Sequence, residues 1–356
     1  MCEAFPDTVT YIANSCYFNY MVHVKQKIFI TRHSVRYPSD LFNALTQKYQ
    51  IDFPAKDGSD TWITDILMES IGAYDAILCR ASDTITAPII EAASKGRTRI
   101  IANYAVGVDN IDVAYAKERG IVVTNTPDVL TDAVAELTFM LLLSVSRNVG
   151  AIQRKMREAH FPKRVCGRDL YGKTLGLVGL GRIGRAVAHR AHAFGMNVVY
   201  YSPMRHTEHE GDKIIYCATL NELLATADIV SLHAPIDTAQ KVPMIGAPEL
   251  ARMKEGAILL NTARGKLVDE QALIEILLNQ PSKLWGVGLD VFQKEKDLPD
   301  YPVPAVLLDL FRTQERNVVL TSHIGSATFE TRAEMGRMAL ENIDAVLQGR
   351  PPLNGV

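Results

Sequence analysis

The chain has 356 residues, of which 47% are hydrophobic and 22% are charged, and its formal net charge is −2. This length favours two domains, and this apolar content excludes an intrinsically disordered chain. Since 38 lysines and arginines face 40 aspartates and glutamates, we expect no nucleic-acid partner and no electrostatic attachment to a membrane.

Residues 1–24 contain no lysine or arginine, so they lack the basic start of a secretory signal, and we expect an N-terminal extension there. No stretch of the chain reaches the roughly 18 apolar residues of a membrane helix, so we expect no membrane span. The five cysteines are an odd number without a Cys-x-x-Cys pair. They favour reduced thiols in the cytoplasm and indicate neither a disulfide framework nor a metal site.

The first third of the chain alternates apolar strands with helices. Strands are predicted at 27–31, 74–79, 99–102 and 121–124, with helices such as 85–94 and 112–119 between them. This alternation is typical of a parallel sheet covered on both faces. The helix that follows, at 129–146, is apolar on nearly every face. Another domain or another subunit must cover it, and we expect a homodimer.

A second alternating series begins after Gly172. Its strands are predicted at 174–178, 197–201, 229–232, 257–260, 286–290 and 317–320, and a last helix spans about 328–348. The sequence therefore predicts an α/β fold with two doubly wound parallel-sheet domains. We expect a flavodoxin-like substrate domain at 25–125 plus 326–356 and a Rossmann cofactor domain at 126–325.

A glycine-rich turn joins strand 174–178 to the next helix. Its glycines, Gly179, Gly181 and Gly184, fit the dinucleotide-binding pattern because a strand precedes them and a helix and a second strand follow. The first would permit a tight turn, the second a close approach to a pyrophosphate, and the third close packing of helix on strand. We expect the amides of Arg182 and Ile183 to face the anion. A purely structural glycine turn is the alternative.

The end of strand 197–201 bears on the choice of dinucleotide. An NAD site normally has an Asp or Glu there, whereas this chain has Ser202, followed by Arg205. The missing carboxylate and the added cation favour NADP(H) over NAD(H), and the alternative is a surface arginine beside a tolerant NAD site. Three further residues at strand ends are expected to line the cofactor side of the cleft: His233, Pro235 and Ala263.

Three ionisable residues follow three strands of the second series, namely Arg264, Glu295 and His323. Because ligands bind at the carboxyl ends of strands in open parallel sheets, all three can converge on one crevice. Reduction of a 2-oxo acid needs a cation for the carboxylate and carbonyl, a proton donor, and an anion that keeps this donor charged. Arg264, His323 and Glu295 would supply these in turn. Taken singly, each could instead be a surface, capping or core residue.

With these motifs the chain resembles the D-2-hydroxyacid dehydrogenases from about Lys27 to Asn354. The matching segments are 103–110 (NYAVGVDN), 125–133 (NTPDVLTDA), 178–184 (VGLGRIG), 261–269 (NTARGKLVD), 288–295 (GLDVFQKE) and 323–327 (HIGSA). Within that family, YAVGVDNID, NTPDVLTDA and YYSP are most similar to the glyoxylate and hydroxypyruvate reductases, many of which use NADPH.

The resemblance implies that Arg264, Glu295 and His323 form a triad that reduces a small 2-oxo acid, glyoxylate or hydroxypyruvate, to the D-2-hydroxy acid. It also implies that the backbone amides of Val106 and Gly107 hold the substrate carboxylate, and that Asp290 bonds the nicotinamide amide. Two alternatives remain open. One is an NAD-dependent D-lactate or phosphoglycerate dehydrogenase, and the other is a non-catalytic, dinucleotide-sensing scaffold similar to corepressor members of the family.

Overall fold

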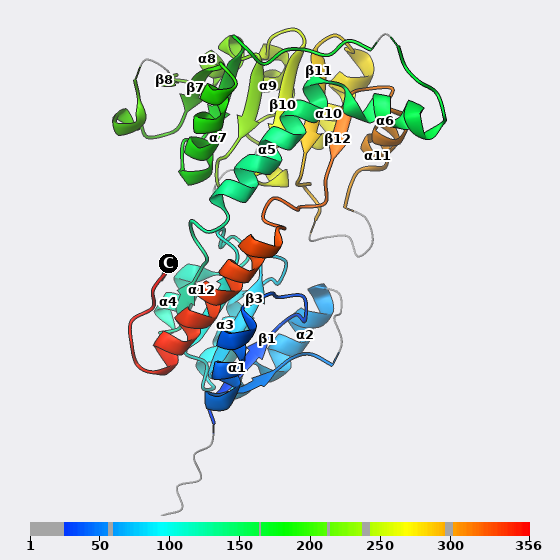
Figure 1. Ribbon diagram of the computed structural model, residues 1–356. Helices are drawn as coiled ribbons and strands as arrows, with labels where there is room; N and C mark the ends of the chain where they lie inside the picture. Colours follow the sequence, from blue (N-terminus) through cyan, green and yellow to red (C-terminus); the bar gives the residue numbers. More distant parts are fainter. Residues whose placement is uncertain (1–24, 56–59, 164, 212–213, 237–242, 296–301) are drawn as a thin grey trace, which may run out of the picture.

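The computed structural model describes residues 25–55, 60–163, 165–211, 214–236, 243–295 and 302–356. The N-terminal extension expected at 1–24 lies outside these residues. Two parallel sheets, one of five strands and one of seven, form two lobes (Figure 1). This confirms the predicted α/β fold with two parallel-sheet domains. The domain boundaries given above stay a prediction.

The smaller lobe holds the five-stranded sheet, in the order β2-β1-β3-β4-β5. This is the strand order of flavodoxin-like folds. Its elements are β1 (Lys27–Ile30), α1 (Ser39–Lys48), β2 (Gln50–Asp52), α2 (Asp60–Ser70), β3 (Ala76–Arg80), α3 (Ala87–Ser94), β4 (Ile100–Tyr104), α4 (Val113–Glu118) and β5 (Val122–Thr124). All five residues of β4 are buried, as expected of a central strand with helices on both faces.

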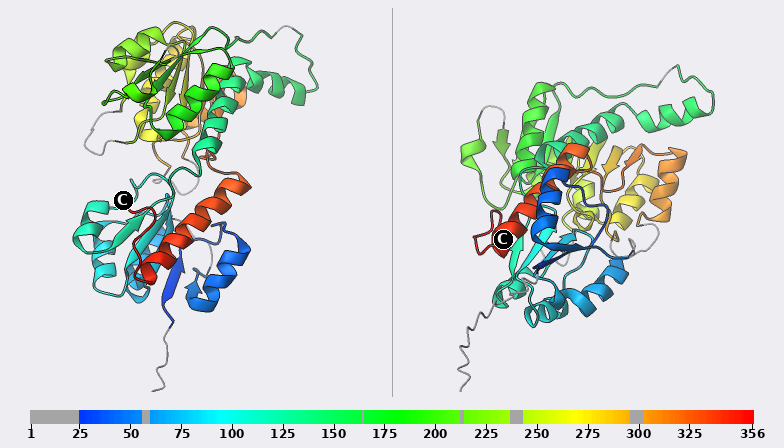
Figure 2. Two further views of the ribbon diagram at one scale, coloured as in Figure 1. Left: turned by 60° about the vertical axis from the view of Figure 1, so that its left-hand side comes forward. Right: turned by 60° about the horizontal axis from the view of Figure 1, so that its bottom comes forward.

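A helix from the other end of the chain completes this lobe. α12 (Phe329–Leu347) packs against β3 and β4, and the left view of Figure 2 shows it lying along the lobe of the N-terminal strands. It begins after Thr328, whose side chain accepts a hydrogen bond from the Thr331 amide. The last residues return to the edge strand β5, where the Val356 amide donates to the Val123 carbonyl. The chain therefore crosses into the second lobe and comes back.

The larger lobe holds the seven-stranded sheet, in the order β12-β11-β10-β9-β6-β7-β8. Counted from β6, this is the strand order of dinucleotide-binding sheets, with one more strand at the far edge. Its strands are β6 (Thr174–Val178), β7 (Asn197–Tyr201), β8 (Ile214–Tyr216), β9 (Ile229–Leu232), β10 (Ala257–Asn261), β11 (Leu284–Leu289) and β12 (Val318–Leu320). Its helices are α5 (Thr131–Ser146), α6 (Val149–Arg157), α7 (Arg182–Ala193), α8 (Leu220–Thr226), α9 (Ala247–Arg252), α10 (Glu270–Asn279) and α11 (Ala305–Thr313).

α5 is the helix that the sequence predicts to be apolar on nearly every face. It packs against α7, β10 and β11, and nine of its sixteen residues are buried. The cover within the described chain is incomplete, because Met140 and Leu143 remain 39% and 38% exposed. A second subunit over this outer face stays a prediction.

Among the described residues no single helix is long and apolar enough to span a membrane. Only together do α5 and α6 reach the length and apolar composition of a membrane span, and the two helices are bent by 70° relative to each other.

Two strands were not predicted, β2 and β8. Each has three residues and lies at or next to the edge of its sheet, and neither contains a fully buried residue. Such short, half-exposed strands have no apolar run and no clear alternation, so the hydrophobic pattern does not reveal them. All ten strands predicted from the pattern are present, within two residues at either end.

Candidate active site

The three ionisable residues expected to converge follow neighbouring strands. Arg264 follows β10, Glu295 follows β11 and His323 follows β12, and these strands are adjacent in the sheet. Two of the three are in direct contact, since Nδ1 of His323 lies 2.7 Å from Oε2 of Glu295. The other oxygen, Oε1, accepts a hydrogen bond from the Phe292 amide at 2.5 Å. The carboxylate therefore fixes the ring through Nδ1 and leaves Nε2 as the nitrogen for proton transfer.

His323 has a strained backbone, with a φ of 55°. Asp290 stabilises this conformation, because its carbonyl accepts a hydrogen bond from the His323 amide at 2.8 Å. Its carboxylate accepts hydrogen bonds from the Thr321 hydroxyl and from the Ile324 and Gly325 amides, at 2.6 to 2.9 Å. Burial raises the pKa of Asp290, and these donors act in the opposite direction. Asp290 thus anchors the loop that presents the imidazole. Its contact with a nicotinamide stays a prediction.

Arg264 contacts the smaller lobe rather than the other two members of the predicted triad. Its Nε and Nη2 donate hydrogen bonds to Oδ1 of Asp109, at 3.0 and 2.9 Å, and its Nη1 donates to the Ala263 carbonyl at 2.9 Å. Asn261 fixes the turn between β10 and the arginine, because its side-chain amide donates to the Arg264 carbonyl at 2.8 Å. The guanidinium lies directly on Gly107, where an added Cβ would overlap Nη2.

The loop that carries Val106 and Gly107 is held from inside the smaller lobe. The side chain of the buried Asn103 donates to the Gly107 carbonyl at 2.8 Å and to Oδ1 of Asn110 at 3.0 Å. Asn110 in turn donates to the carbonyls of Arg80 and Asp83. This network of buried amides keeps the loop in one conformation. Gly107 does not have a positive φ, so its place is explained by the close approach of Arg264 and not by backbone conformation.

The glycine-rich turn has the local geometry that its spacing predicts. Gly179 has a φ of 99°, and a Cβ there would lie 2.7 Å from the His233 carbonyl oxygen. A Cβ at Gly184 would overlap the Gly179 carbonyl, so helix and strand pack closely. At Gly181, apart from its own helix and chain neighbours, no atom of the described residues lies within 4 Å of the Cβ position, which leaves space at the start of α7 for a pyrophosphate. These residues fit a dinucleotide. Arg182 adds an ion pair of 2.5 Å with Asp128.

Arg205, the cation predicted to bind a 2′-phosphate, forms an ion pair with Glu210. Nε and Nη2 of Arg205 donate to the two oxygens of Glu210 at 2.8 and 2.7 Å. Arg205 and the Tyr200 hydroxyl together lower the pKa of Glu210 to about 2. The side chain of Ser202, at the end of β7, is nearly buried and lies 3.5 Å from His206. The charge that the sequence assigns to this corner is therefore largely balanced, and NADP preference stays a prediction.

The remaining predicted cofactor residues lie at strand ends of the larger lobe. His233 follows β9, its Nε2 lies 2.8 Å from the Ser231 hydroxyl, and burial lowers its pKa to about 4. The ring is therefore neutral near pH 7, and its expected place beside the cofactor stays a prediction. Pro235 is exposed, and the Ala263 amide donates to Oδ1 of Asn261 at 3.0 Å. Their contact with a cofactor stays a prediction.

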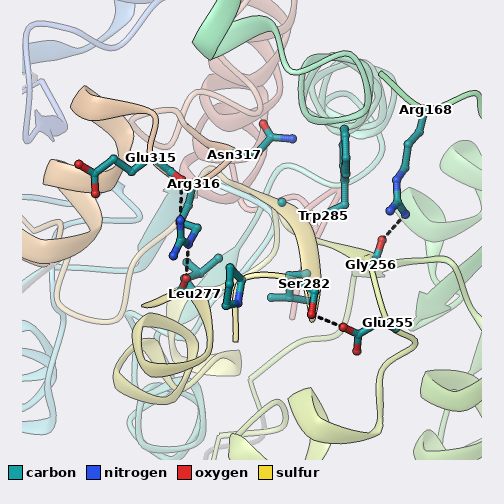
Figure 3. A pocket seen from close by; sticks show the side chains of 12 residues that line it. Arg168, Glu255, Gly256, Leu277, Ser282, Trp285, Glu315, Arg316 and Asn317 are labelled. Atoms are coloured by element: carbon teal, nitrogen blue, oxygen red, sulfur yellow. Dashed lines mark hydrogen bonds between the residues drawn. The ribbon is translucent and has the colours of Figure 1, made fainter. Parts of the chain in front are cut away.

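A pocket of about 480 Å³ lies elsewhere in the larger lobe (Figure 3). The guanidinium of Arg168 stacks 4.5 Å over the ring of Trp285 in this pocket, and Arg316 lines it as well. Its lining residues Gly256 and Asn317 directly precede β10 and β12, so the pocket lies at the amino ends of the strands. Ligands of open parallel sheets bind beyond the carboxyl ends. We therefore do not assign the predicted chemistry to this pocket.

Two carboxylates at the site were missed by sequence reasoning. Asp109 lies in a quoted segment and follows β4, so the rule that placed Arg264, Glu295 and His323 at strand ends could have found it. Glu210 gives no such signal, because it follows a short turn after β7. The guanidinium of Arg264 is 29% exposed, and the imidazole of His323, beside Glu295, is 47% exposed. The first can bind a small carboxylate, and the second can donate a proton.

Comparisons with known proteins give one consistent picture. The family described as D-isomer specific 2-hydroxyacid dehydrogenase, NAD binding domain, matches residues 139–325. A glyoxylate reductase of Korarchaeum cryptofilum is 41% identical over 336 residues, which cover 93% of this chain and 96% of that protein. The structure of a glyoxylate reductase from Paecilomyes thermophila superposes with a TM-score of 0.80 at 30% identity, covering 94% and 98% of the two chains. An NADPH-dependent glyoxylate/hydroxypyruvate reductase from Sinorhizobium meliloti gives a TM-score of 0.75 at 29% identity, over 93% and 98%.

Proposed function

The chain belongs to the D-isomer specific 2-hydroxyacid dehydrogenase family, and on that premise we propose that it reduces hydroxypyruvate to the D-2-hydroxy acid or glyoxylate to the achiral glycolate. Membership confirms the resemblance predicted from the sequence and makes the chain an NAD(P)-dependent enzyme of that family. The observation that carries the finer proposal is the 2.7 Å contact between His323 and Glu295. It provides a proton donor whose orientation is fixed by a carboxylate.

In the proposed reaction the nicotinamide cofactor, when bound, supplies a hydride to C2 of the 2-oxo acid. Arg264 holds the substrate carboxylate and polarises the carbonyl, with the amides of Val106 and Gly107 as further donors. His323 donates a proton from Nε2 to the carbonyl oxygen as it gains negative charge. Glu295 keeps the ring oriented through Nδ1 and balances the positive charge of its protonated form.

We propose NADP(H) as the favoured cofactor. Ser202 stands where an NAD site normally has a carboxylate, and one similar structure is described as NADPH-dependent. Arg205 contributes through the edge of its guanidinium that Glu210 does not use. The test is the ratio of kcat/KM for NADPH to that for NADH. Arg205→Ala should reduce this ratio, and an unchanged ratio would remove the role of Arg205.

A panel of glyoxylate, hydroxypyruvate, pyruvate and phosphohydroxypyruvate, each with NADH and with NADPH, tests the reaction itself. Glyoxylate or hydroxypyruvate should give the highest kcat/KM. A preference for pyruvate or phosphohydroxypyruvate with NADH would favour the lactate or phosphoglycerate alternative, and no turnover would favour the scaffold. His323→Ala should abolish turnover while NADPH still binds, and retained turnover would refute the role of the imidazole.

We further propose that the enzyme is a homodimer in the cytoplasm. Large apolar side chains are exposed on α5, on α6 and in the segment between α6 and β6, namely Met140, Leu143, Met156, Phe161 and Tyr171. An exposed apolar surface of this kind is typical of a subunit interface. The proposed location rests on the cysteine spacing, which lacks a Cys-x-x-Cys pair and indicates no disulfide framework. Sedimentation should give twice the chain mass, and a monomer at micromolar concentration would refute the dimer.

A further inference from the structure

Asp109 and Arg264 form an ion pair between the two lobes. Asp109 follows β4 of the five-stranded sheet, and Arg264 follows β10 of the seven-stranded sheet. Oδ1 of Asp109 accepts two hydrogen bonds, from Nε at 3.0 Å and from Nη2 at 2.9 Å. Neither side chain is fully exposed, with 29% of the arginine and 27% of the aspartate accessible. This pair is therefore only partly screened by water.

We infer that Asp109 is a positioning residue, which orients the guanidinium of Arg264 so that its free end faces the substrate carboxylate. This inference rests on the proposed function. An arginine side chain has five N–H groups, which form a side edge at Nε and Nη2 and an end edge at Nη1 and Nη2. Asp109 takes the side edge, and the Ala263 carbonyl takes one N–H of Nη1. Among the hydrogen bonds of the described residues, one N–H of Nη1 and one N–H of Nη2 remain unused, and two such donors suit a bidentate contact with a carboxylate.

Three features keep this orientation defined. The side-chain amides of Asn103 and Asn110 hold the loop that carries Asp109. Gly107 lets the guanidinium lie in close contact with this loop, because an added Cβ would overlap Nη2. The side-chain amide of Asn261 holds the arginine's own backbone. Since the two ends of the contact belong to different lobes, Arg264 is correctly oriented only when the lobes lie in this arrangement.

A competing interpretation makes the opposite prediction. If Asp109 occupied the place of the substrate carboxylate, its removal would free Arg264 and lower the KM for the substrate. The bond geometry argues against this, because Asp109 occupies Nε and one N–H of Nη2 and still leaves one N–H each on Nη1 and Nη2 for a substrate. In our interpretation, removal of Asp109 lets the guanidinium rotate, so KM rises and kcat falls.

The test compares Asp109→Ala and Asp109→Asn with the wild type, alone and in an Arg264→Ala background. The readouts are kcat and KM for glyoxylate, the KM for NADPH, and the inhibition constant of oxalate, an unreactive analogue. Asp109→Ala should reduce kcat/KM for glyoxylate about tenfold and weaken oxalate inhibition about as much, with the KM for NADPH unchanged. Asp109→Asn keeps an acceptor oxygen and should restore part of the loss. In the Arg264→Ala background the same substitution should have no further effect, because Asp109 acts through the arginine.

Asp344→Asn is the matched control. Its carboxylate also accepts a hydrogen bond of 2.9 Å from an arginine, Arg350, beyond the last turn of α12. The control should have wild-type kinetics. Wild-type values for Asp109→Ala, a lowered KM, or an equal loss in the Arg264→Ala background would overturn the inference while the proposed function stands. A wild-type enzyme that turns over none of the 2-oxo acids would overturn the proposed function itself, and the inference with it.

Discussion

Gly107→Ala should damage the site without unfolding the protein. The added Cβ would overlap Nη2 of Arg264 and would lie 2.8 Å from Oδ1 of Asp109 and 2.9 Å from Cζ of Arg264. Heavy atoms in ordinary contact are about 3.5 Å apart, so the guanidinium must move by roughly 1 Å or more. A displacement of that size costs about 100-fold in rate for a group that orients substrate, equivalent to about 2.7 kcal/mol. Because the end of a long side chain can shift and the backbone φ is not positive, we expect little loss of folding stability.

The assay is steady-state reduction of glyoxylate, with thermal unfolding measured on the same samples. kcat/KM should fall about 100-fold, and the unfolding midpoint should stay within about 2 °C of the wild type. Gly211→Ala is the control, because apart from its chain neighbours no atom of the described residues lies within 4 Å of its Cβ position, and its φ is not positive. Alanine keeps the backbone amide of residue 107, so wild-type kinetics in Gly107→Ala would show that only the amide matters and would refute the argument from close approach.

Three further predictions test other parts of the site. Glu295→Gln removes the charged acceptor 2.7 Å from Nδ1 of His323 and should lower kcat at least tenfold with little change in the KM for NADPH, and an unchanged kcat would contradict this. Ser202→Asp places a carboxylate at the end of β7 and should raise the KM for NADPH more than the KM for NADH, whereas equal effects would argue against a 2′-phosphate at this corner. His233 has a pKa of about 4 in the native state, against about 6.5 unfolded. As pH falls, His233 is therefore protonated in the unfolded chain before it is protonated in the native protein. The free energy of unfolding should decrease by up to about 3 kcal/mol between pH 6.5 and pH 4 for this reason. Urea unfolding of His233→Gln should show a weaker loss over that range, and an equal loss would contradict the assignment.

The sequence locates the three candidate ionisable groups because strand ends are recognisable in it. Apolar runs locate β10, β11 and β12, and the carboxyl-end rule then places Arg264, Glu295 and His323 on one side of one sheet. The structure adds a strained histidine backbone and the loop anchored by Asp290. The strain has no sequence signal, since it arises from hydrogen bonds between loops that are distant along the chain.

The contacts between the two lobes could not be predicted from the sequence. Gly107 is recognisable as a glycine in a loop, and the family resemblance implies a substrate-binding amide there. The space that it leaves for Arg264 depends on how one lobe faces the other, and no local pattern encodes that placement. The same holds for the partner of Arg205, because the turn that brings Glu210 back to it follows from backbone geometry after β7 and not from spacing.

The two arginines expected to bind anions show why charge alone does not define such a site. Asp109 and Glu210 each bind the side edge of an arginine, Arg264 and Arg205, through Nε and Nη2. Each carboxylate reduces the net attraction for an incoming anion, yet each also fixes the plane in which the end edge is presented. Binding of a substrate carboxylate or a 2′-phosphate would then depend mainly on two N–H groups that are already correctly oriented. The long-range electrostatic attraction between arginine and anion would contribute less. Affinity at both places should therefore depend weakly on ionic strength and strongly on any change that rotates the guanidinium.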